Sequence, residues 1–507
     1  MDIPALLGSL PPRIGAIVRA HAAATPDAPA LREPGRAVSY AELAAAIDQH
    51  AALLRQLGVR GGDRVMVVGE NCIAQVALIF AAADIDAWIV NVNARLSPAE
   101  IDNIRNHSGA RRVIYLVAAS PEARVHAERD KAADHGEIAV GPLDDACTPE
   151  PVETSNEQTA ALIYTTGTTG HPKGVMLTHR NLLFIANVSS TLRGLTPRDR
   201  AYGVLPISHV YGLVSVMLGT LCAGACLYLA PRFSAGAMLR AIVHDQLSIL
   251  QGVPAMYARL LELADGPVTT RLRFLYAGGS PLDPVLKQQV ESVFGIPLHN
   301  GYGMTESSPT ISQTRLDAPR TDTSVGSVIP GVDVRIVDAD GVDVANGEAG
   351  ELWARGPNIM KGYYKEPALT HAAMRDGGWL NTGDLARRDA DGALFIVGRT
   401  KELIIRSGFN VYPLEVETVL NSHPGVAQSA VVGRAAAGGN EEVIAFVEAN
   451  PAQAPDLDEL RAFLAAHLSP YKCPSRIVVM DALPAAATGK ILKGRLKALA
   501  SELKDSQ

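Results

Sequence analysis

The segment YTTGTTGHPKG, from Tyr164 to Gly174, brings together the groups that bind phosphate. It combines flexible glycines and threonine hydroxyls with the positive charge of Lys173, directly after a short apolar run. A glycine-rich loop between a strand and a helix exposes backbone N–H groups, which bind phosphate oxygens. We therefore predict a phosphate-binding loop, and the alternative is a flexible surface turn.

The residues around Lys173 differ from those of a Walker loop. That loop needs a serine or threonine directly after its lysine, because the hydroxyl holds Mg²⁺. Here Gly174 follows Lys173, and Pro172 precedes it. The sequence therefore disfavours a P-loop kinase or GTPase.

The bulk composition narrows the class of protein. A chain of 507 residues exceeds what one hydrophobic core usually supports, so we expect two or more domains. Apolar residues make up 47% and charged residues 20%, which is typical of soluble globular proteins. The net charge of −7 gives no basic excess, so we expect no nucleic-acid partner. We find no signal peptide and no apolar run that could span a membrane, and we expect a cytoplasmic protein.

Helical and strand patterns alternate along most of the chain. Between 39 and 114, and again after residue 160, helices alternate with short apolar strands, which indicates parallel sheets. Ser39 and Glu42 have the spacing of a capping box at the start of a helix. Between about 325 and 400 the pattern has period two around Asp-Gly and Asn-Gly pairs, which predicts antiparallel hairpins. The remaining C-terminal residues predict a compact α+β unit.

Six segments resemble the signature motifs of one family. The stretch from Tyr164 to Gly174 is similar to the family's phosphate loop, with Thr166 in place of the usual serine. The other five are GYGMTE (301–306), GELWARGPNIMKGYYKEPALT (350–370), TGDL (382–385), GRTKELIIRSGFNVYPLEVE (398–417) and LPAAATGK (483–490). On these motifs the chain is identified as a member of the adenylate-forming (AMP-binding, ANL) superfamily, which includes acyl-CoA synthetases, peptide-synthetase adenylation domains and firefly luciferase.

The resemblance implies an α/β fold in two domains. Residues 1–398 would form a large N-terminal domain of two doubly wound mixed sheets and a small distorted β-barrel. Residues 399–507 would form a small, mobile α+β domain that rotates about a hinge at Lys401. A monomer or a homodimer is expected.

The resemblance also implies an acid–thiol ligase that uses ATP, Mg²⁺ and coenzyme A. A carboxylic acid and ATP would give acyl-AMP and pyrophosphate, and the thiol of CoA would then take the acyl group as a thioester. The site must supply cations and N–H donors, because two like charges about 4 Å apart repel by about 4 kcal/mol at an effective dielectric constant of about 20. Its partners would be these small molecules.

The glycine-threonine loop is the part that the resemblance assigns to the β- and γ-phosphates. The expected contacts are Thr165, Thr166, Gly167, Thr168, Thr169, Gly170 and Lys173. Glu306 would hold Mg²⁺ together with Thr165, since oxygen ligands suit that ion, and Thr305 would contact the α-phosphate. A solvated loop carboxylate is the alternative for Glu306.

Residues in the middle of the chain are assigned to the nucleoside by the same resemblance. Tyr302 would stack on adenine, Asn300 would bond its exocyclic amine, and Asp384 and Arg399 would bind the ribose hydroxyls. Core packing for Tyr302 and a turn or helix cap for Asp384 are the alternatives. The other expected nucleotide contacts are Gly278, Gly279, Ser280, Gly301, Gly303, Met304 and Ile396.

The C-terminal segment would supply a lysine to the reaction. Lys490 is implied to bridge the carboxylate and the α-phosphate and to stabilise the charge that develops there. After rotation about Lys401, the segment around Gly408 would line the tunnel for the pantetheine arm of CoA. Lys493 stands where the family often has arginine, so a bidentate contact would be lost.

The stretch SHVYGLVSVMLG, residues 208–219, is implied to form one wall of the acyl pocket. His209 would lie near the reacting carboxylate, and a hydrogen-bonded structural histidine is the alternative. The other expected contacts are Tyr211, Gly212, Ser215, Gly301 and Met304. These segments contain no Asp or Glu placed to bind an α-ammonium group, which argues against an amino acid substrate. Their small and apolar residues suit a fatty or aryl acid. We therefore expect a fatty acid first, then an aryl acid of the benzoate or cinnamate type, or malonate.

Two other functions are compatible with the same motifs. The acyl group could pass to a stand-alone carrier protein in place of CoA. A non-catalytic nucleotide sensor would bind ATP without releasing pyrophosphate, but Lys490 and Glu306 argue against it.

Replacing Lys490 by alanine should separate the two half-reactions. We expect Lys490→Ala to abolish formation of acyl-AMP, because the developing charge loses its cation, and to spare thioester formation from supplied acyl-AMP. Gly408→Leu should do the reverse by blocking the thiol. Pyrophosphate release and thioester yield measure the two steps, and equal loss in both steps for Lys490→Ala would contradict the two-pose scheme.

Overall fold

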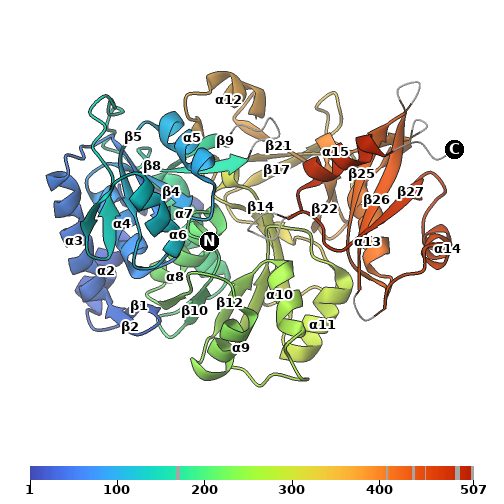
Figure 1. The fold of residues 1–507 in the computed structure, drawn as a ribbon, viewed down its shortest axis with the longest axis horizontal. Coiled ribbons are helices and arrows are strands. Elements are labelled where there is room, and N and C mark those ends of the chain that lie inside the picture. The colour runs from blue at the N-terminus through green and yellow to red at the C-terminus, as the bar shows by residue number, and fades with distance from the viewer. Residues whose placement is uncertain (167–171, 407–408, 437–439, 451–452, 486–490, 504–507) are drawn as a thin grey trace.

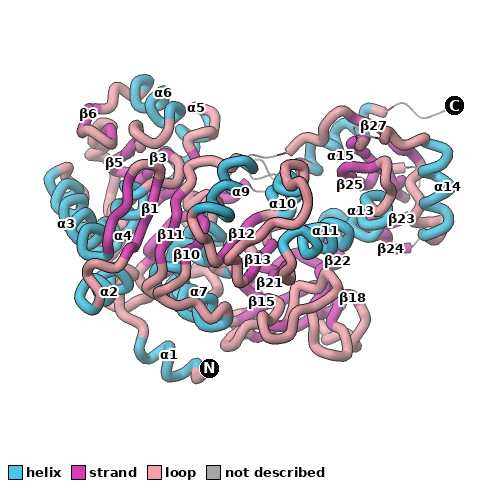
Figure 2. Tube along the Cα trace, turned by 90° about the horizontal axis from the view of Figure 1, so that it is seen from below, coloured by secondary structure: helices cyan, strands magenta, loops and turns pink. Residues whose placement is uncertain are grey.

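The computed structural model describes residues 1–166, 172–406, 409–436, 440–450, 453–485 and 491–503. Figure 1 follows the chain from blue N-terminal elements on the left to red C-terminal elements on the right. The elements after about residue 400 lie at one end of the long axis, and the view in Figure 2 keeps them at the same end. The structure thus consists of a large N-terminal part and a small C-terminal part.

The first large sheet has eight strands in a mixed arrangement. A parallel centre, in which β4 and β5 pair with β3, and β8 pairs with β4, is extended by antiparallel strands at both edges. The strands in order are β19 (Gly362–Tyr363), β9 (Pro172–Thr178), β8 (Thr159–Thr166), β4 (Trp88–Asn93), β3 (Arg64–Gly69), β5 (Ala110–Tyr115), β7 (Ile138–Val140) and β6 (Ala133–His135).

The second large sheet has nine strands and is also mixed. Its order is β16 (Ser327–Val328), β15 (Thr310–Gln313), β14 (Leu298–Gly303), β13 (Phe274–Ala277), β12 (Ile249–Gly252), β10 (Arg200–Gly203), β11 (Cys226–Leu229), β1 (Pro29–Glu33) and β2 (Arg36–Ser39). The five strands β14, β13, β12, β10 and β11 run parallel, as the alternating sequence pattern predicts.

Helices surround and separate the two sheets. They are α1 (Ile3–Ser9), α2 (Ala16–Ala24), α3 (Tyr40–Gln56), α4 (Ile73–Asp84), α5 (Pro98–Ser108), α6 (Pro121–Arg129), α7 (His179–Leu192), α8 (Gly219–Cys222), α9 (Ala235–His244), α10 (Pro254–Leu261) and α11 (Pro284–Phe294), with a π-helix η1 (Tyr211–Leu218) and a 3₁₀ turn η2 (Thr305–Ser307). Helix α4 is buried from Ile73 to Ala83 because its residues are apolar all round, and it contacts strands of both sheets.

A smaller antiparallel sheet precedes the C-terminal part. Its strands are β17 (Asp333–Val337), β18 (Ala349–Arg355), β20 (Met374–Arg375), β21 (Trp379–Arg388) and β22 (Leu394–Arg399), with α12 (Pro367–Ala373) beside it. This sheet confirms the hairpins predicted from the period-two pattern. The large part is therefore α/β with two mixed sheets and a third, smaller sheet, as the family resemblance implies.

The C-terminal part has its own apolar core. After the 3₁₀ turn η3 (Thr400–Glu402), it contains β23 (Ile404–Arg406), β24 (Phe409–Val411), α13 (Pro413–Asn421), β25 (Val426–Ala435), β26 (Glu441–Ala449), α14 (Leu457–His467), β27 (Arg476–Met480) and α15 (Lys493–Glu502). Two clusters of buried residues lie on the two faces of the β25–β26–β27 sheet. The predicted α+β unit is confirmed.

The capping box predicted at Ser39 is present at the start of α3. The Glu42 amide donates to Ser39 Oγ at 3.2 Å, and the Ser39 amide donates to Glu42 Oε2 at 2.7 Å. These two bonds satisfy amides that the first helical turn leaves without partners. The beginning of α3 is thus fixed by local sequence.

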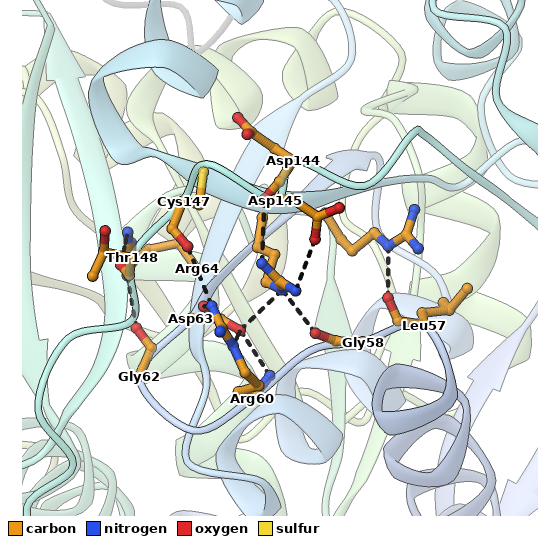
Figure 3. A network of polar contacts seen from close by, with 12 residues as sticks. Leu57, Gly58, Arg60, Gly62, Asp63, Arg64, Asp144, Asp145, Cys147 and Thr148 are labelled. Carbon is orange, nitrogen blue, oxygen red and sulfur yellow. Dashed lines mark hydrogen bonds and ion pairs between the residues drawn. The ribbon is translucent and has the colours of Figure 1, made fainter.

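A polar network holds the segment 144–148 against the start of β3 (Figure 3). The carboxylate of Asp63 is fully buried and accepts from Arg60 Nε at 3.1 Å, with Arg111 Nε 3.4 Å away. Arg111 also donates to the Gly58 carbonyl at 2.7 Å and pairs with Asp145 at 3.3 Å. Asp63 therefore supplies the buried negative charge of this network.

Removing the carboxylate of Asp63 should destabilise the N-terminal part. We expect Asp63→Ala to lower the free energy of unfolding by about 3 kcal/mol, because Arg111 loses its buried counter-ion. The matched control is Asp145→Ala, because the Asp145 side chain is 79% exposed. This variant should change the free energy of unfolding by less than about 0.5 kcal/mol. Urea unfolding followed by tryptophan fluorescence measures both, and equal effects would contradict this assignment.

Candidate active site

The predicted phosphate loop connects two antiparallel strands. Strand β8 ends at Thr166 and β9 begins at Pro172, with Thr165 opposite Lys173 in the register. The loop is therefore followed by a strand, and the next helix, α7, begins only after β9. The expected contacts Gly167, Thr168, Thr169 and Gly170 lie outside the described residues.

The segment after β18 fixes the base of this hairpin. Strand β19 pairs with β9, the Tyr364 amide donates to the Gly174 carbonyl at 2.8 Å, and the Lys361 amide donates to the Met176 carbonyl at 3.0 Å. The preceding residue, Met360, donates its amide to the Glu306 carbonyl at 2.9 Å. The phosphate-loop hairpin and the GYGMTE segment are thus attached to one short stretch of chain.

Tyr363 links the lysine of the hairpin to Glu306. The Lys173 ammonium lies 5.1 Å from the centre of the Tyr363 ring. The Tyr363 hydroxyl donates to Glu306 Oε1 at 2.8 Å. Burial, followed by the charge of Glu306, raises the pKa of Tyr363, so the phenol keeps the proton that it donates. The structure therefore brings Lys173 and Glu306 together, as the predicted phosphate and metal site requires.

Tyr363 itself carries no role in the sequence-based prediction. It lies within GELWARGPNIMKGYYKEPALT, one of the six motifs, so the signal that could have identified it was present. The ring contact with Lys173 and the hydrogen bond to Glu306 appear only once β19 pairs with β9.

The donor groups around Glu306 fit a metal that is shared with phosphate. In the described part of the chain, no cluster of three or more His, Cys, Asp or Glu side chains could hold a metal ion. Mg²⁺ typically keeps several waters and is bound by one or two carboxylates together with substrate phosphates. Glu306, with Thr165 beside Lys173 in the hairpin, fits a magnesium ion that arrives with the nucleotide.

A second polar cluster joins the predicted adenine and ribose residues. The Tyr302 hydroxyl donates to Asp384 Oδ2 at 2.5 Å, and Arg399 Nε lies 3.1 Å from Asp384 Oδ1. Asp384 and Arg399 face each other across β21 and β22, whereas Tyr302 comes from β14. Burial and the charge of Asp384 raise the pKa of Tyr302, so it remains a donor. These three predicted residues therefore meet at the junction of two sheets.

Asn300 is largely engaged by the backbone around it. Its Nδ2 donates to the carbonyls of Thr323 at 3.0 Å and Ser324 at 3.3 Å, and its Oδ1 accepts from the Gly301 amide at 2.9 Å. A carbonyl oxygen has a second lone pair, so the contact with adenine stays a prediction.

Two of the predicted glycines are sites of close packing. A Cβ at Gly301 would lie 2.1 Å from the Tyr276 hydroxyl, and a Cβ at Gly303 would lie 1.8 Å from the Pro309 carbonyl oxygen. Larger residues cannot occupy these positions without displacing β14. The other predicted contacts on these segments are Gly278, Gly279 and Ser280 after β13, Met304 and Thr305 at η2, and Ile396 in β22.

The predicted acyl wall is a buried π-helix. Every residue of η1, from Tyr211 to Leu218, is buried. π-helices are rare in proteins, and those that occur are often found at functional sites. Ser215 Oγ lies 3.5 Å from Thr310 Oγ1. His209 is exposed just before the helix, where its Nδ1 accepts from the Tyr211 amide at 3.3 Å. Gly212 packs so closely that a Cβ there would lie 2.3 Å from the Pro206 carbonyl oxygen.

Among the predicted C-terminal residues, Lys401 and Lys493 are described, whereas Lys490 and Gly408 lie outside the described residues. Lys401 is exposed in η3. Lys493 Nζ lies 2.8 Å from Glu417 Oε1 and 3.0 Å from Glu402 Oε2. The lysine at this position therefore contacts two separate carboxylates, one of them in the predicted hinge, in a geometry that needs no planar fork.

Comparison with known proteins agrees with this geometry. Residues 18–364 match the family described as AMP-binding enzyme, and residues 415–490 match the AMP-binding enzyme C-terminal domain. A feruloyl-CoA synthase of an Amycolatopsis species is 36% identical over 503 residues, which cover 97% of this chain and 98% of that protein. A long-chain-fatty-acid–CoA ligase of Yersinia pestis is 32% identical and covers 93% and 91%.

A solved structure gives the same result for the fold. The o-succinylbenzoate CoA synthetase of Bacillus subtilis, in complex with its acyl-adenylate intermediate, superposes with a TM-score of 0.82. It is 30% identical and covers 95% of this chain and 97% of that chain.

The chain therefore belongs to the family of AMP-binding enzymes. It is an AMP-forming acid–thiol ligase, and its cofactors are ATP, Mg²⁺ and coenzyme A. Among the described residues, no helix is both long and apolar enough to cross a membrane.

The role of the hydrogen bond from Tyr363 to Glu306 can be tested by removing the Tyr363 hydroxyl. We expect Tyr363→Phe to lower kcat for acyl-AMP formation about 10-fold and to raise the Mg²⁺ concentration needed, because Glu306 loses a charge-assisted hydrogen bond. Pyrophosphate release at varied Mg²⁺ measures both effects.

The neighbouring tyrosine provides the control. Tyr364 donates its hydroxyl to Glu150 Oε1 at 2.6 Å, away from Glu306, so Tyr364→Phe should leave the Mg²⁺ dependence unchanged. If the two variants behaved alike, Tyr363 would have no special part in the metal site.

Proposed function

We propose that the protein is an aryl-acid–CoA ligase that acts on a planar acid of the benzoate or cinnamate type. The coarser class, an ATP-dependent acid–CoA ligase, is given by the family. The observation that supports the aryl acid is the packing of Tyr211, the first residue of η1, against Gly278. The ring of Tyr211 is buried, and its Cε1 would lie only 3.1 Å from a Cβ at Gly278. A tyrosine ring against glycine backbone offers a flat, apolar surface for another ring.

The first step joins the acid to the nucleotide. A carboxylate oxygen attacks the α-phosphorus of ATP, the bond from that phosphorus to the bridging oxygen breaks, and pyrophosphate leaves. Mg²⁺ neutralises phosphate charge when it is bound. In this proposal Lys173 and the loop threonines bind the β- and γ-phosphates, Glu306 holds the metal, and Lys490 stabilises charge at the α-phosphate.

The second step releases AMP. The sulfur of CoA attacks the acyl carbon, the C–O bond to AMP breaks, and the thiol proton passes to solvent. We infer that residues 1–398 and 399–507 act as two domains, and that rotation about Lys401 exchanges Lys490 for the segment around Gly408. The pairing of Lys493 with Glu402 next to the hinge supports an ordered hinge in the pose described here.

The nucleoside end is assigned to the cluster of Tyr302, Asp384 and Arg399. Two oxygens of Asp384 are held by the phenol and the guanidinium, which orients the carboxylate for the ribose hydroxyls. Tyr302 presents its ring from β14 and its hydroxyl to Asp384, so stacking on adenine and support of Asp384 can occur together.

A fatty acid is the second candidate. The buried, apolar residues of η1 and the similarity to the Yersinia pestis ligase favour it. Against a long alkyl tail stand two buried polar groups without hydrogen-bond partners in the described structure, Arg193 Nε and the Tyr211 hydroxyl, which an apolar chain could not satisfy.

A panel of acids distinguishes these candidates. With ATP, Mg²⁺ and CoA, we expect kcat/KM for cinnamates or benzoates to exceed that for acids of eight to sixteen carbons by at least about 10-fold, because the flat wall suits a ring. Pyrophosphate release measures the rates, with Lys490→Ala as the blank. A preference for the fatty acids would overturn the proposal. If a carrier protein were acylated and no acyl-CoA formed, the acyl acceptor would be the carrier protein and not CoA.

A further inference from the structure

Arg193 is a buried arginine directly behind the proposed acyl wall. It follows the last residue of α7 and is only 1% exposed. Its guanidinium donates to Gln251 Oε1 at 2.8 Å, to the Ser215 carbonyl at 3.3 Å and to Gln313 Oε1 at 3.3 Å. It also lies over the ring of Tyr276, 4.5 Å from the ring centre.

The positive charge of Arg193 has only neutral neighbours. All three acceptors are uncharged, and the ion pairs found among the described residues include none between Arg193 and a carboxylate. Burial raises the pKa of Tyr276 to about 12 against the opposing charge of Arg193, and burial also raises the pKa of Tyr211. Neither phenol therefore supplies the negative charge that a buried guanidinium normally requires.

Two polar atoms at this place also lack hydrogen-bond partners in the described structure. They are Nε of Arg193 and the hydroxyl of Tyr211, whose side chain is more than nine-tenths buried. Unpaired buried polar groups are rare, because each one loses its hydrogen bonds to water. Arg64 offers a contrast, since it is 3% exposed and bonds three carbonyls, one through each guanidinium nitrogen.

The contacts of Arg193 connect it to the residues proposed to line the acyl pocket. Ser215 belongs to η1, and Gln313 pairs with Gly301 across β14 and β15. The Tyr276 hydroxyl occupies the space in which a side chain at Gly301 would stand. The residues proposed to flank the acyl group thus lie on two sides of Arg193.

We propose that Arg193 and the Tyr211 hydroxyl bind an oxygen acceptor at the end of the aryl acid remote from its carboxylate. The chemical class is an aryl acid with a phenolic oxygen on the ring. This inference rests on the proposed function. A phenolic or phenolate oxygen accepts a charge-assisted hydrogen bond from the guanidinium and satisfies both unpaired groups. A second carboxylate would offer the same acceptor chemistry, and the test contains an arm for it.

The test compares acids that differ by this one oxygen. We expect wild-type enzyme to use 4-hydroxycinnamate at least about 10-fold better than cinnamate in kcat/KM. In Arg193→Met, kcat/KM for 4-hydroxycinnamate should fall about 10- to 100-fold, and that for cinnamate by less than about threefold, as expected for loss of a hydrogen bond to a charged group. A greater preference for 4-carboxycinnamate, lost in the same variant, would assign the site to a carboxylate and overturn the phenolic class.

Two further variants keep the test decisive. Tyr211→Phe should lower the preference for the hydroxylated acid in the same direction, and it removes only one oxygen if Arg193→Met does not fold. Arg64→Met, a buried arginine outside the acyl pocket, should affect both acids equally. If the wild type activates no aryl acid, the proposed function fails. If it activates both acids and the variants change them equally, only the role of Arg193 is overturned.

Discussion

The attachment of residues 360–364 to strand β9 and to Glu306 is the constraint on which the active site depends. Backbone bonds hold this segment to both the phosphate-loop hairpin and the GYGMTE segment. Tyr363 then lies between the Lys173 ammonium and the Glu306 carboxylate. A site that must bring a carboxylate to a triphosphate needs its cations and metal ligand at fixed distances, and backbone hydrogen bonds fix them more firmly than flexible side chains could.

A second junction fixes the residues proposed for the other end of the nucleotide site. Tyr302 comes from the nine-stranded sheet, whereas Asp384 and Arg399 come from the smaller antiparallel sheet that precedes the proposed hinge. Because the proposed hinge at Lys401 comes shortly after Arg399, the residues assigned to ribose would lie next to the point of the proposed domain rotation. Behind the proposed acyl wall, Arg193 is a buried positive charge whose hydrogen-bond acceptors are all uncharged. In our proposal an oxygen of the substrate balances this charge.

Local sequence predicted much of this fold, and tertiary contacts account for what it missed. The capping box at Ser39 and the buried helix α4 follow from residue type and spacing, which act within a few residues. The strand β9 after the phosphate loop was not predicted. It pairs with its neighbour β8 in a hairpin, and its other partner, β19, lies far away in the sequence. Motifs predicted roles for Glu306, Asp384 and Arg399, which stay predictions, whereas the contacts of Tyr363 and Arg193 depend on residues up to about 190 positions away.

The most direct test of the account follows the oxygen of the acid. The acid labelled with ¹⁸O in its carboxylate is incubated with enzyme, ATP, Mg²⁺ and CoA, and the nucleotide product is analysed by mass spectrometry. Attack by the carboxylate on the α-phosphorus predicts AMP that carries one ¹⁸O atom in its phosphate. Unlabelled AMP, or ADP with the label in inorganic phosphate, would contradict the claim that this site forms an acyl-adenylate.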